Sequence, residues 1–177
     1  ARRLTPYLQG GGAGLRLSAY WSDAAGSRSA AFAARDAPIS SAERERLLRL
    51  TAMAKAAGFQ YRPDSHDYWM RDPERIAPFF SHTRKRWQAV FDEIQLDLDA
   101  QRMAAGVQSV KLVGRAASAG AAAMRVEWGL KLGRRWLEPE HAQRLARAGR
   151  GTHIVPGLGL VRLAEAQTEA LDEWRVA

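Results

Sequence analysis

The stretch MRVEWGLKLGRRWLEPEHAQRLARAGRGTHIVPGLGLVRL, which runs from Met124 to Leu163, decides the kind of fold that this chain can adopt. It opens with apolar and polar residues in alternation, which predicts a half-buried β-strand. A helical pattern follows, with Pro139 at its first position and Gly149 just after its end. Two short apolar runs on either side of a Pro-Gly turn signal predict two more strands. The stretch therefore indicates an antiparallel sheet with a helix packed on it.

The strand at the start of this stretch divides its side chains between two faces. Its apolar face consists of Met124, Val126, Trp128, Leu130 and Leu132. Because this face is continuously apolar, we expect it to pack on a core. The run VQSVKLVGRAA just upstream is the second clear strand, and small residues join the two strands as a hairpin.

The first part of the chain predicts a hairpin and then a helix. Residues 14–21, GLRLSAYW, have the alternation of a strand, and residues 27–36 supply the returning strand. The helix begins at a capping box formed by Ser40 and Glu43, and it ends at Gly58. The glycine-rich segment GGGAG near the start is expected to be the only flexible stretch.

The middle of the chain predicts a second hairpin, FQYR and DYWM around PDSH, followed by short elements. Asp72 is the N-cap of a short helix, and Pro78 ends or kinks it. Residues 89–95, AVFDEIQ, have the pattern of a strand, and the helix after them closes at Gly106. Residues 164–174 predict a final acidic helix.

These elements predict an α+β fold with a mainly antiparallel β-sheet and four or five helices. Two parts are expected along the chain. Residues 1–36 form an N-terminal β-hairpin segment packed on the rest, and residues 37–177 form one α+β domain.

Composition excludes several classes of protein. The chain has 177 residues, of which 46% are hydrophobic, so it can bury a core. It has no cysteine, which excludes disulfides, a thiol nucleophile and a thiolate zinc site. Its apolar runs are too short to span a bilayer, and its start lacks the apolar region of a signal peptide. The start also lacks a methionine, so we expect a piece of a longer protein.

The positive charge is concentrated in one part of the chain. Residues 101–162 carry 11 basic and 3 acidic side chains, whereas residues 1–100 carry 15 and 12. The tail, residues 163–177, carries 1 basic and 4 acidic side chains. A local basic excess attracts polyanions such as nucleic acid.

No catalytic constellation stands out. AVFDEIQ resembles the acidic box of superfamily II helicases, but the chain has no phosphate loop, so we expect no ATP hydrolysis by this fragment. His66 lies beside Asp64 and Asp67, and these three residues leave open a small metal-dependent hydrolase as the weakest alternative. We predict no catalytic residue, no metal site and no cofactor in this chain.

The chain has 6 tryptophans, which either pack in the core or stack on the bases of single-stranded nucleic acid. Core packing is the preferred interpretation, because Trp128 shares the apolar face of its strand and Trp69 lies in an aromatic hairpin. Trp136 is the tryptophan that we expect to be exposed.

Three segments together resemble a known family. RLLRLTAMAKAAGF, RDPERIAPFF and the opening stretch are similar, in order and pattern, to the accessory region in front of the ATPase of bacterial Swi/Snf-type superfamily II helicases. The resemblance covers about residues 40–175. Its last four parts are Val126–Leu132, Leu137–His141, Leu158–Leu163 and Ala164–Trp174. The chain departs from the family at Glu138, where a serine or threonine would cap the helix.

The resemblance implies a non-catalytic accessory domain of a DNA-stimulated, ATP-driven translocase. Its partners would be the ATPase lobes of the same polypeptide and DNA, with no membrane partner. ATP and magnesium would bind to those lobes, which would follow residue 177. The protein would act in the bacterial cytoplasm, on the nucleoid. The alternative from the residues alone is a free-standing basic nucleic-acid-binding module.

Five arginines are the candidate contacts with nucleic acid or with the ATPase motor. They are Arg134, Arg135, Arg144, Arg147 and Arg150. The first two follow a turn, the next two share a helical face, and the last follows the end of that helix. We expect all five to lie on one rim.

Overall fold

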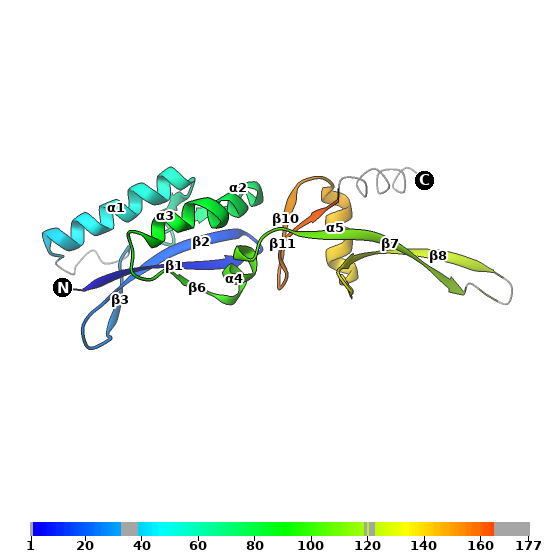
Figure 1. Cartoon of the computed structure of the whole chain (residues 1–177), viewed down its shortest axis with the longest axis horizontal. Helices are drawn as coiled ribbons and strands as arrows, with labels where there is room; N and C mark the ends of the chain where they lie inside the picture. The colour runs from blue at the N-terminus through cyan, green and yellow to red at the C-terminus, as the bar shows by residue number, and fades with distance from the viewer. Residues whose placement is uncertain (1, 33–38, 119, 121–122, 165–177) are drawn as a thin grey trace.

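Two β-sheets, each with its own core, lie one after the other along the long axis of the molecule (Figure 1). The computed structural model describes residues 2–32, 39–118, 120 and 123–164. The α+β fold is confirmed. Among the described strands, β1 with β6 and β7 with β11 pair in parallel, and every other pairing is antiparallel. No helix in the described part of the chain is long and apolar enough to cross a membrane.

The first sheet begins with a hairpin of two long strands whose alternate side chains enter the core. In spatial order its strands are β4 (Gln60–Arg62), β5 (Asp67–Met70), β2 (Gly14–Ser22), β1 (Arg3–Gly11) and β6 (Gln95–Leu96), with β3 (Arg28–Ala30) paired to β2. Leu15, Leu17 and Trp21 are at most 1% exposed. Strand β1 was not predicted from the sequence, and the expectation of a flexible GGGAG segment was wrong. Its glycines end β1, form the tight turn and begin β2.

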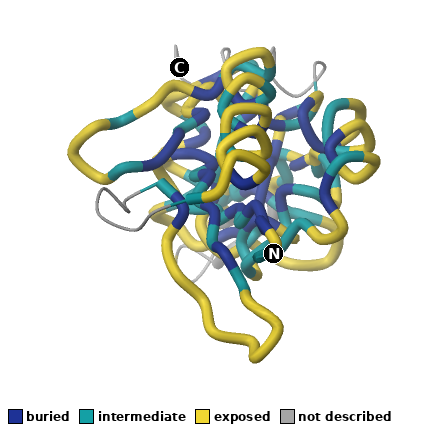
Figure 2. Tube along the Cα trace, turned by 90° about the vertical axis from the view of Figure 1, so that its left-hand side faces the viewer, coloured by how far each residue is buried: buried dark blue, intermediate teal, exposed yellow. Residues whose placement is uncertain are grey.

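Helix α1 (Ser41–Ala57) covers this sheet and has the predicted ends. The Ser40 hydroxyl accepts the Glu43 N–H at 3.1 Å, and the Glu43 carboxylate accepts the Ser40 N–H at 3.0 Å. Gly58 ends the helix in the left-handed conformation, with φ 102°. The outer face of α1 and the loop between β2 and β3 are exposed (Figure 2).

Glu43 is buried and also binds Arg2, with 2.7 Å between the Oε2 and Nε atoms. The bond from Arg2, followed by the backbone N–H of Ser40, lowers the pKa of Glu43 to about 2. One carboxylate therefore caps α1 and fastens the N-terminal end of β1 to it.

Three short helical pieces follow β5. Helix α2 (Pro73–Pro78) begins at the predicted N-cap, where the Asp72 carboxylate accepts the Glu74 N–H at 3.0 Å. After Pro78 a π-helical turn (Phe79–Thr83) leads into α3 (Arg84–Gln88). Trp87 is 1% exposed, and its ring centroid lies 5.1 Å from that of Phe79.

The predicted strand over residues 89–95 was wrong. Only β6 (Gln95–Leu96) forms there, because α3 continues to Gln88 and a turn then folds Phe91 back onto Trp87, with ring centroids 6.5 Å apart. Helix α4 (Leu98–Ala104) follows, and its N-cap, Asp97, also accepts the Gly10 N–H of β1 at 3.0 Å.

The second sheet contains the two long strands predicted from the sequence. In spatial order its strands are β10 (Thr152–Val155), β11 (Gly159–Leu163), β7 (Gln108–Ser118), β8 (Met124–Leu132) and β9 (Arg135–Trp136). Helix α5 (Pro139–Ala148) inserts Leu145 into the second core, beside Val110 and Leu130. The predicted acidic helix over residues 164–174 lies almost wholly outside the described residues, which end at Ala164.

The two sheets are joined through β11 and α2. Leu160 of β11 is fully buried in the first core, whereas Val161 is fully buried in the second. The Glu74 carboxylate of α2 accepts the Thr152 N–H and binds Arg162 at 2.9 Å. The bond from Thr152 lowers the pKa of Glu74. We call residues 2–106 the first lobe and residues 107–164 the second lobe.

The expected division of the chain at residue 36 does not follow these lobes. Strand β2, before that position, pairs with β5, after it, and residues from both sides share one core. The boundary between the two cores lies near Gly106, where the chain leaves α4 and enters β7.

Candidate nucleic-acid interface

Strands β7 and β8 form a hairpin that extends beyond α5, away from both cores (Figure 1). We call the part of this hairpin that begins at the Lys111–Lys131 pair, beyond Val110 and Leu132, the arm. The pairing of Leu112 with Leu130 and of Gly114 with Trp128 fixes the register. Even-numbered residues of both strands therefore share one face of the arm, and odd-numbered residues share the other.

The even-numbered face is apolar, as predicted, but only its base is covered. Leu130 is 3% exposed, whereas Trp128 is 48% and Val126 is 59% exposed. Helix α5 packs on the second core near Leu130, and no element in the described part of the chain covers the arm further out. The expectation that Trp128 packs in the core was therefore wrong.

Each face of the arm carries one tryptophan that lies across a glycine. A Cβ added to Gly114 would stand 3.0 Å from the Trp128 ring, and one added to Gly129 would stand 2.7 Å from the Trp136 ring. The missing side chains let both indoles lie close against the backbone of the hairpin. Trp136 is 37% exposed, which confirms the predicted exposure of this tryptophan.

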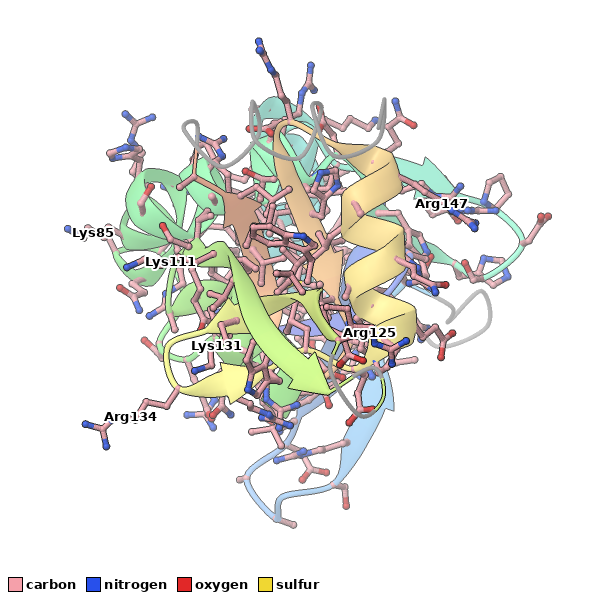
Figure 3. All side chains as sticks on the ribbon, turned by 90° about the vertical axis from the view of Figure 1, so that its right-hand side faces the viewer. Lys85, Lys111, Arg125, Lys131, Arg134 and Arg147 are labelled. Atoms are coloured by element: carbon pink, nitrogen blue, oxygen red, sulfur yellow. The ribbon has the colours of Figure 1, made fainter. Side chains whose placement is uncertain are left out.

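The odd-numbered face brings positive charge next to Trp136. Lys111 stands directly opposite Lys131 across the two strands. The Lys131 Nζ atom lies 4.8 Å from the centroid of the Trp136 ring, a cation–π distance. Figure 3 shows Lys111, Lys131 and Arg134 pointing to the same side of the molecule. We call Lys111, Lys131, Arg134 and Trp136 the basic face of the arm.

The two lysines were not among the residues predicted from the sequence. The signal for them lies in the register of the hairpin, because two lysines on separate strands meet only when the pairing is known. Arg125 also points from the odd-numbered side of β8, but it binds Glu127 at 2.8 Å. Figure 3 shows Arg125 apart from Lys131, as the twist of a two-stranded ribbon requires.

The five predicted arginines are all exposed, but they do not lie on one rim. Arg134 belongs to the basic face of the arm, whereas Arg147 of α5 points to the opposite side of the molecule (Figure 3). Arg144 lies one turn before Arg147 on the same exposed side of α5, and Arg150 follows the end of that helix. Arg135 alternates with Trp136 along β9 and lines a cavity of about 80 Å³ beside α5.

Two of the three residues of the predicted alternative metal site, Asp67 and His66, contact other partners. The Asp67 carboxylate is buried and binds Arg16 and the Ser65 hydroxyl. His66 has its Nδ1 atom 3.3 Å from the Tyr61 hydroxyl. No group of three metal-ligating side chains occurs among the residues that the structure describes.

The acidic pair in AVFDEIQ lies on the surface between α3 and β6. Glu93 is 55% exposed at its side chain and stands 3.9 Å from Arg3. An exposed pair at this distance contributes little to stability.

Comparison with known proteins found no protein family, no curated protein and no solved structure that matches this chain.

Proposed function

We propose that this chain is a non-catalytic domain that binds single-stranded nucleic acid through the basic face of the arm. The observation that carries the proposal is the pairing of Lys111 with Lys131 beside Trp136. Like charges directly opposite each other destabilise a strand pair. A phosphate bound between the two lysines would remove this repulsion, so the arrangement favours an anionic ligand.

The exposed indole favours a single strand over a duplex. An unpaired base can stack on a tryptophan, and such stacking is worth about 1–3 kcal/mol for each base. The Trp136 ring lies close against Gly129 with 37% of its surface exposed, so little side-chain freedom remains to be lost on binding. A base stacked on Trp136 and a phosphate bound to the two lysines would belong to the same nucleotide. Arg134 supplies a further cation on the same side.

The apolar face of the arm favours an accessory role within a larger protein. Val126 and Trp128 form an exposed apolar area on the face of the arm opposite to Lys111 and Lys131, and exposed apolar areas commonly bind other proteins. We propose that this face docks on the ATPase lobes that the Swi/Snf resemblance implies. In that setting the parent is an ATP-dependent helicase or translocase of the bacterial cytoplasm, and its ATPase lobes bind ATP and magnesium.

Fluorescence anisotropy with a labelled oligodeoxythymidylate, at two salt concentrations, tests the proposal. Lys111→Gln combined with Lys131→Gln should weaken binding about tenfold or more. It should also reduce the slope of log affinity against log salt by about 0.7, because the phosphate bound between the two lysines is no longer neutralised. Trp136→Ala should weaken binding with little change in this slope, since stacking releases no counterion.

The matched control is Arg44→Gln with Lys55→Gln, which removes the same charge from the exposed side of α1. This control should leave affinity and slope close to those of the unchanged protein. Equal losses from the two double variants would show that only net charge matters, and the proposed face would then be rejected. Thermal unfolding of each variant verifies that the arm still folds.

A further inference from the structure

A second basic site lies in the first lobe, on different elements from the arm. It is a cleft of about 500 Å³ between the end of α1, the hairpin β4–β5 and the start of α2. Three arginines line it, namely Arg62 at the end of β4, Arg71 after β5 and Arg75 in α2. Clefts of this size hold small organic ligands.

Two carboxylates beside these arginines already have other partners. Asp67, which stands opposite Arg62 in the hairpin, binds Arg16 and Ser65. Asp72 lines the cleft, but its Oδ1 atom accepts the Glu74 N–H and caps α2. Within the described part of the chain, none of the three arginines forms an ion pair with a carboxylate. The cleft therefore keeps an excess of positive charge.

Gly58 leaves room for one of these arginines at the wall of the cleft. A Cβ on Gly58 would stand 3.1 Å from the Arg75 guanidinium, so the glycine that ends α1 also leaves room for this side chain. The C-terminal end of a helix attracts a cation, which gives Arg75 a structural role in addition to any contact with a ligand. Arg62 and Arg71 have no such support from α1.

Aromatic surface lies beside the charges. Trp69 lines the cleft, and the Arg71 guanidinium stands 6.0 Å from its ring centroid. Tyr61, which is 45% exposed, lines the cleft as well, with its ring centroid 5.2 Å from that of Tyr68. Guanidinium and aromatic planes are the surfaces on which nucleobases stack.

We infer that this cleft binds a nucleoside phosphate, with the phosphate at Arg62 and Arg75 and the base against Trp69 and Arg71. Guanidinium groups bind phosphate oxygens with two parallel hydrogen bonds, which suits them to this ligand better than lysine. The inference does not depend on the arm, because no residue of the arm lines the cleft.

Isothermal titration calorimetry with adenosine 5′-monophosphate tests the inference. Adenosine and inorganic phosphate, as separate probes, should each bind at least about tenfold more weakly, because each makes only part of the contacts. Arg62→Gln with Arg71→Gln should weaken binding of the monophosphate about tenfold or more. Trp69→Phe should cause a smaller loss, since the ring remains aromatic.

The control is Arg144→Gln with Arg147→Gln, which removes equal charge from α5 and should leave binding of the monophosphate unchanged. No heat of binding at about 1 mM monophosphate, or equal losses in both double variants, would overturn the inference. A 5′-phosphorylated oligodeoxythymidylate, tested with Lys111→Gln and Lys131→Gln present, identifies the source of the ligand. If the oligonucleotide binds much more tightly than the monophosphate, the ligand of the cleft is the 5′ end of a strand. If the two bind equally, the ligand is a free nucleotide.

Discussion

The first lobe and the arm are built from the same kind of alternating sequence, yet their apolar faces differ in how far they are buried. Along β2, Leu15, Leu17 and Trp21 are at most 1% exposed. Along β8, Val126 and Trp128 are 59% and 48% exposed. Helix α1 and the helical pieces after β5 complete the core over the first sheet, whereas α5 covers only the base of the second hairpin. Alternation therefore predicts a strand and its two faces, but an element elsewhere in the chain determines whether a face is buried.

The largest difference between the two regions should appear when a tryptophan is removed from each. Trp87→Ala in the first core should lower the free energy of unfolding by about 3–5 kcal/mol, because a large buried cavity is left. Trp128→Ala on the arm should lower it by about 1 kcal/mol or less, since the ring packs on only one side. Urea unfolding measures both values. Equal losses would mean that the arm is packed against something in solution, and the comparison would fail.

The same contrast should exist within one strand. Leu130→Ala at the base of β8 should cost about 2–4 kcal/mol, because the side chain is buried in the second core. Val126→Ala, on the same face of the same strand, should cost about 0.5 kcal/mol or less. A large loss from Val126→Ala, measured in the same urea series, would place the end of the arm in a core.

Acid should destabilise the first lobe through the buried carboxylate of Glu43, which has no buried counterpart among the described residues of the arm. The pKa of Glu43 is about 2 in the folded chain and about 4.5 when it is not perturbed. Its contribution to stability is therefore fully present above the unfolded value and is lost as the pH falls through the folded value. Glu43→Gln should flatten the dependence of stability on pH between about 4.5 and 2, while a glutamine at this position still suits the capping box.

Glu45→Gln provides the control for this titration, because Glu45 is exposed on the same helix. The slope of unfolding free energy against pH should remain in Glu45→Gln. A slope that is equally steep in Glu43→Gln would assign the acid sensitivity to other carboxylates.

The smallest effect is expected from the ion pair on the arm. Arg125 and Glu127 are 64% and 38% exposed at their side chains, and water screens their attraction. Arg125→Ala should therefore change the free energy of unfolding by about 0.5 kcal/mol or less. A larger loss, at low salt and recovered by Arg125→Lys, would show that charge on the arm is as strongly coupled to folding as the Glu43 pair.

Local signals in the sequence predicted much of the fold. The capping box at Ser40, the N-cap at Asp72 and the glycine after α1 all depend on neighbouring residues, and all three form as expected. Two other assignments failed, because side-chain packing and strand pairing decided them. The segment before β6 became a turn because Phe91 packs on Trp87, and β1 was missed because its partner, β2, was assigned only to the strand that follows it.

The candidate interface was less predictable than the fold. Arg134 could be selected from its place after a turn. Its three neighbours on the basic face come from β7, β8 and β9, and only the register of these strands brings them together. Sequence spacing placed Arg144 and Arg147 on one face of α5 correctly. Sequence spacing contains no information on the orientation of that helix relative to the arm. It therefore could not show whether the five arginines lie on one side of the molecule or on two.

The shared strand β11 has a consequence for the order in which the protein can fold as it is made. Leu160 completes the first core, yet the ribosome adds it after the whole of the arm and α5. The parallel pairing of Val161 with Gln108 must likewise wait until both strands have been synthesised. At usual rates of translation, roughly 5–20 residues per second, the interval between α4 and β11 lasts several seconds. During that time the first lobe exposes the apolar surface that Leu160 later covers, and transiently exposed apolar surface is what chaperones bind.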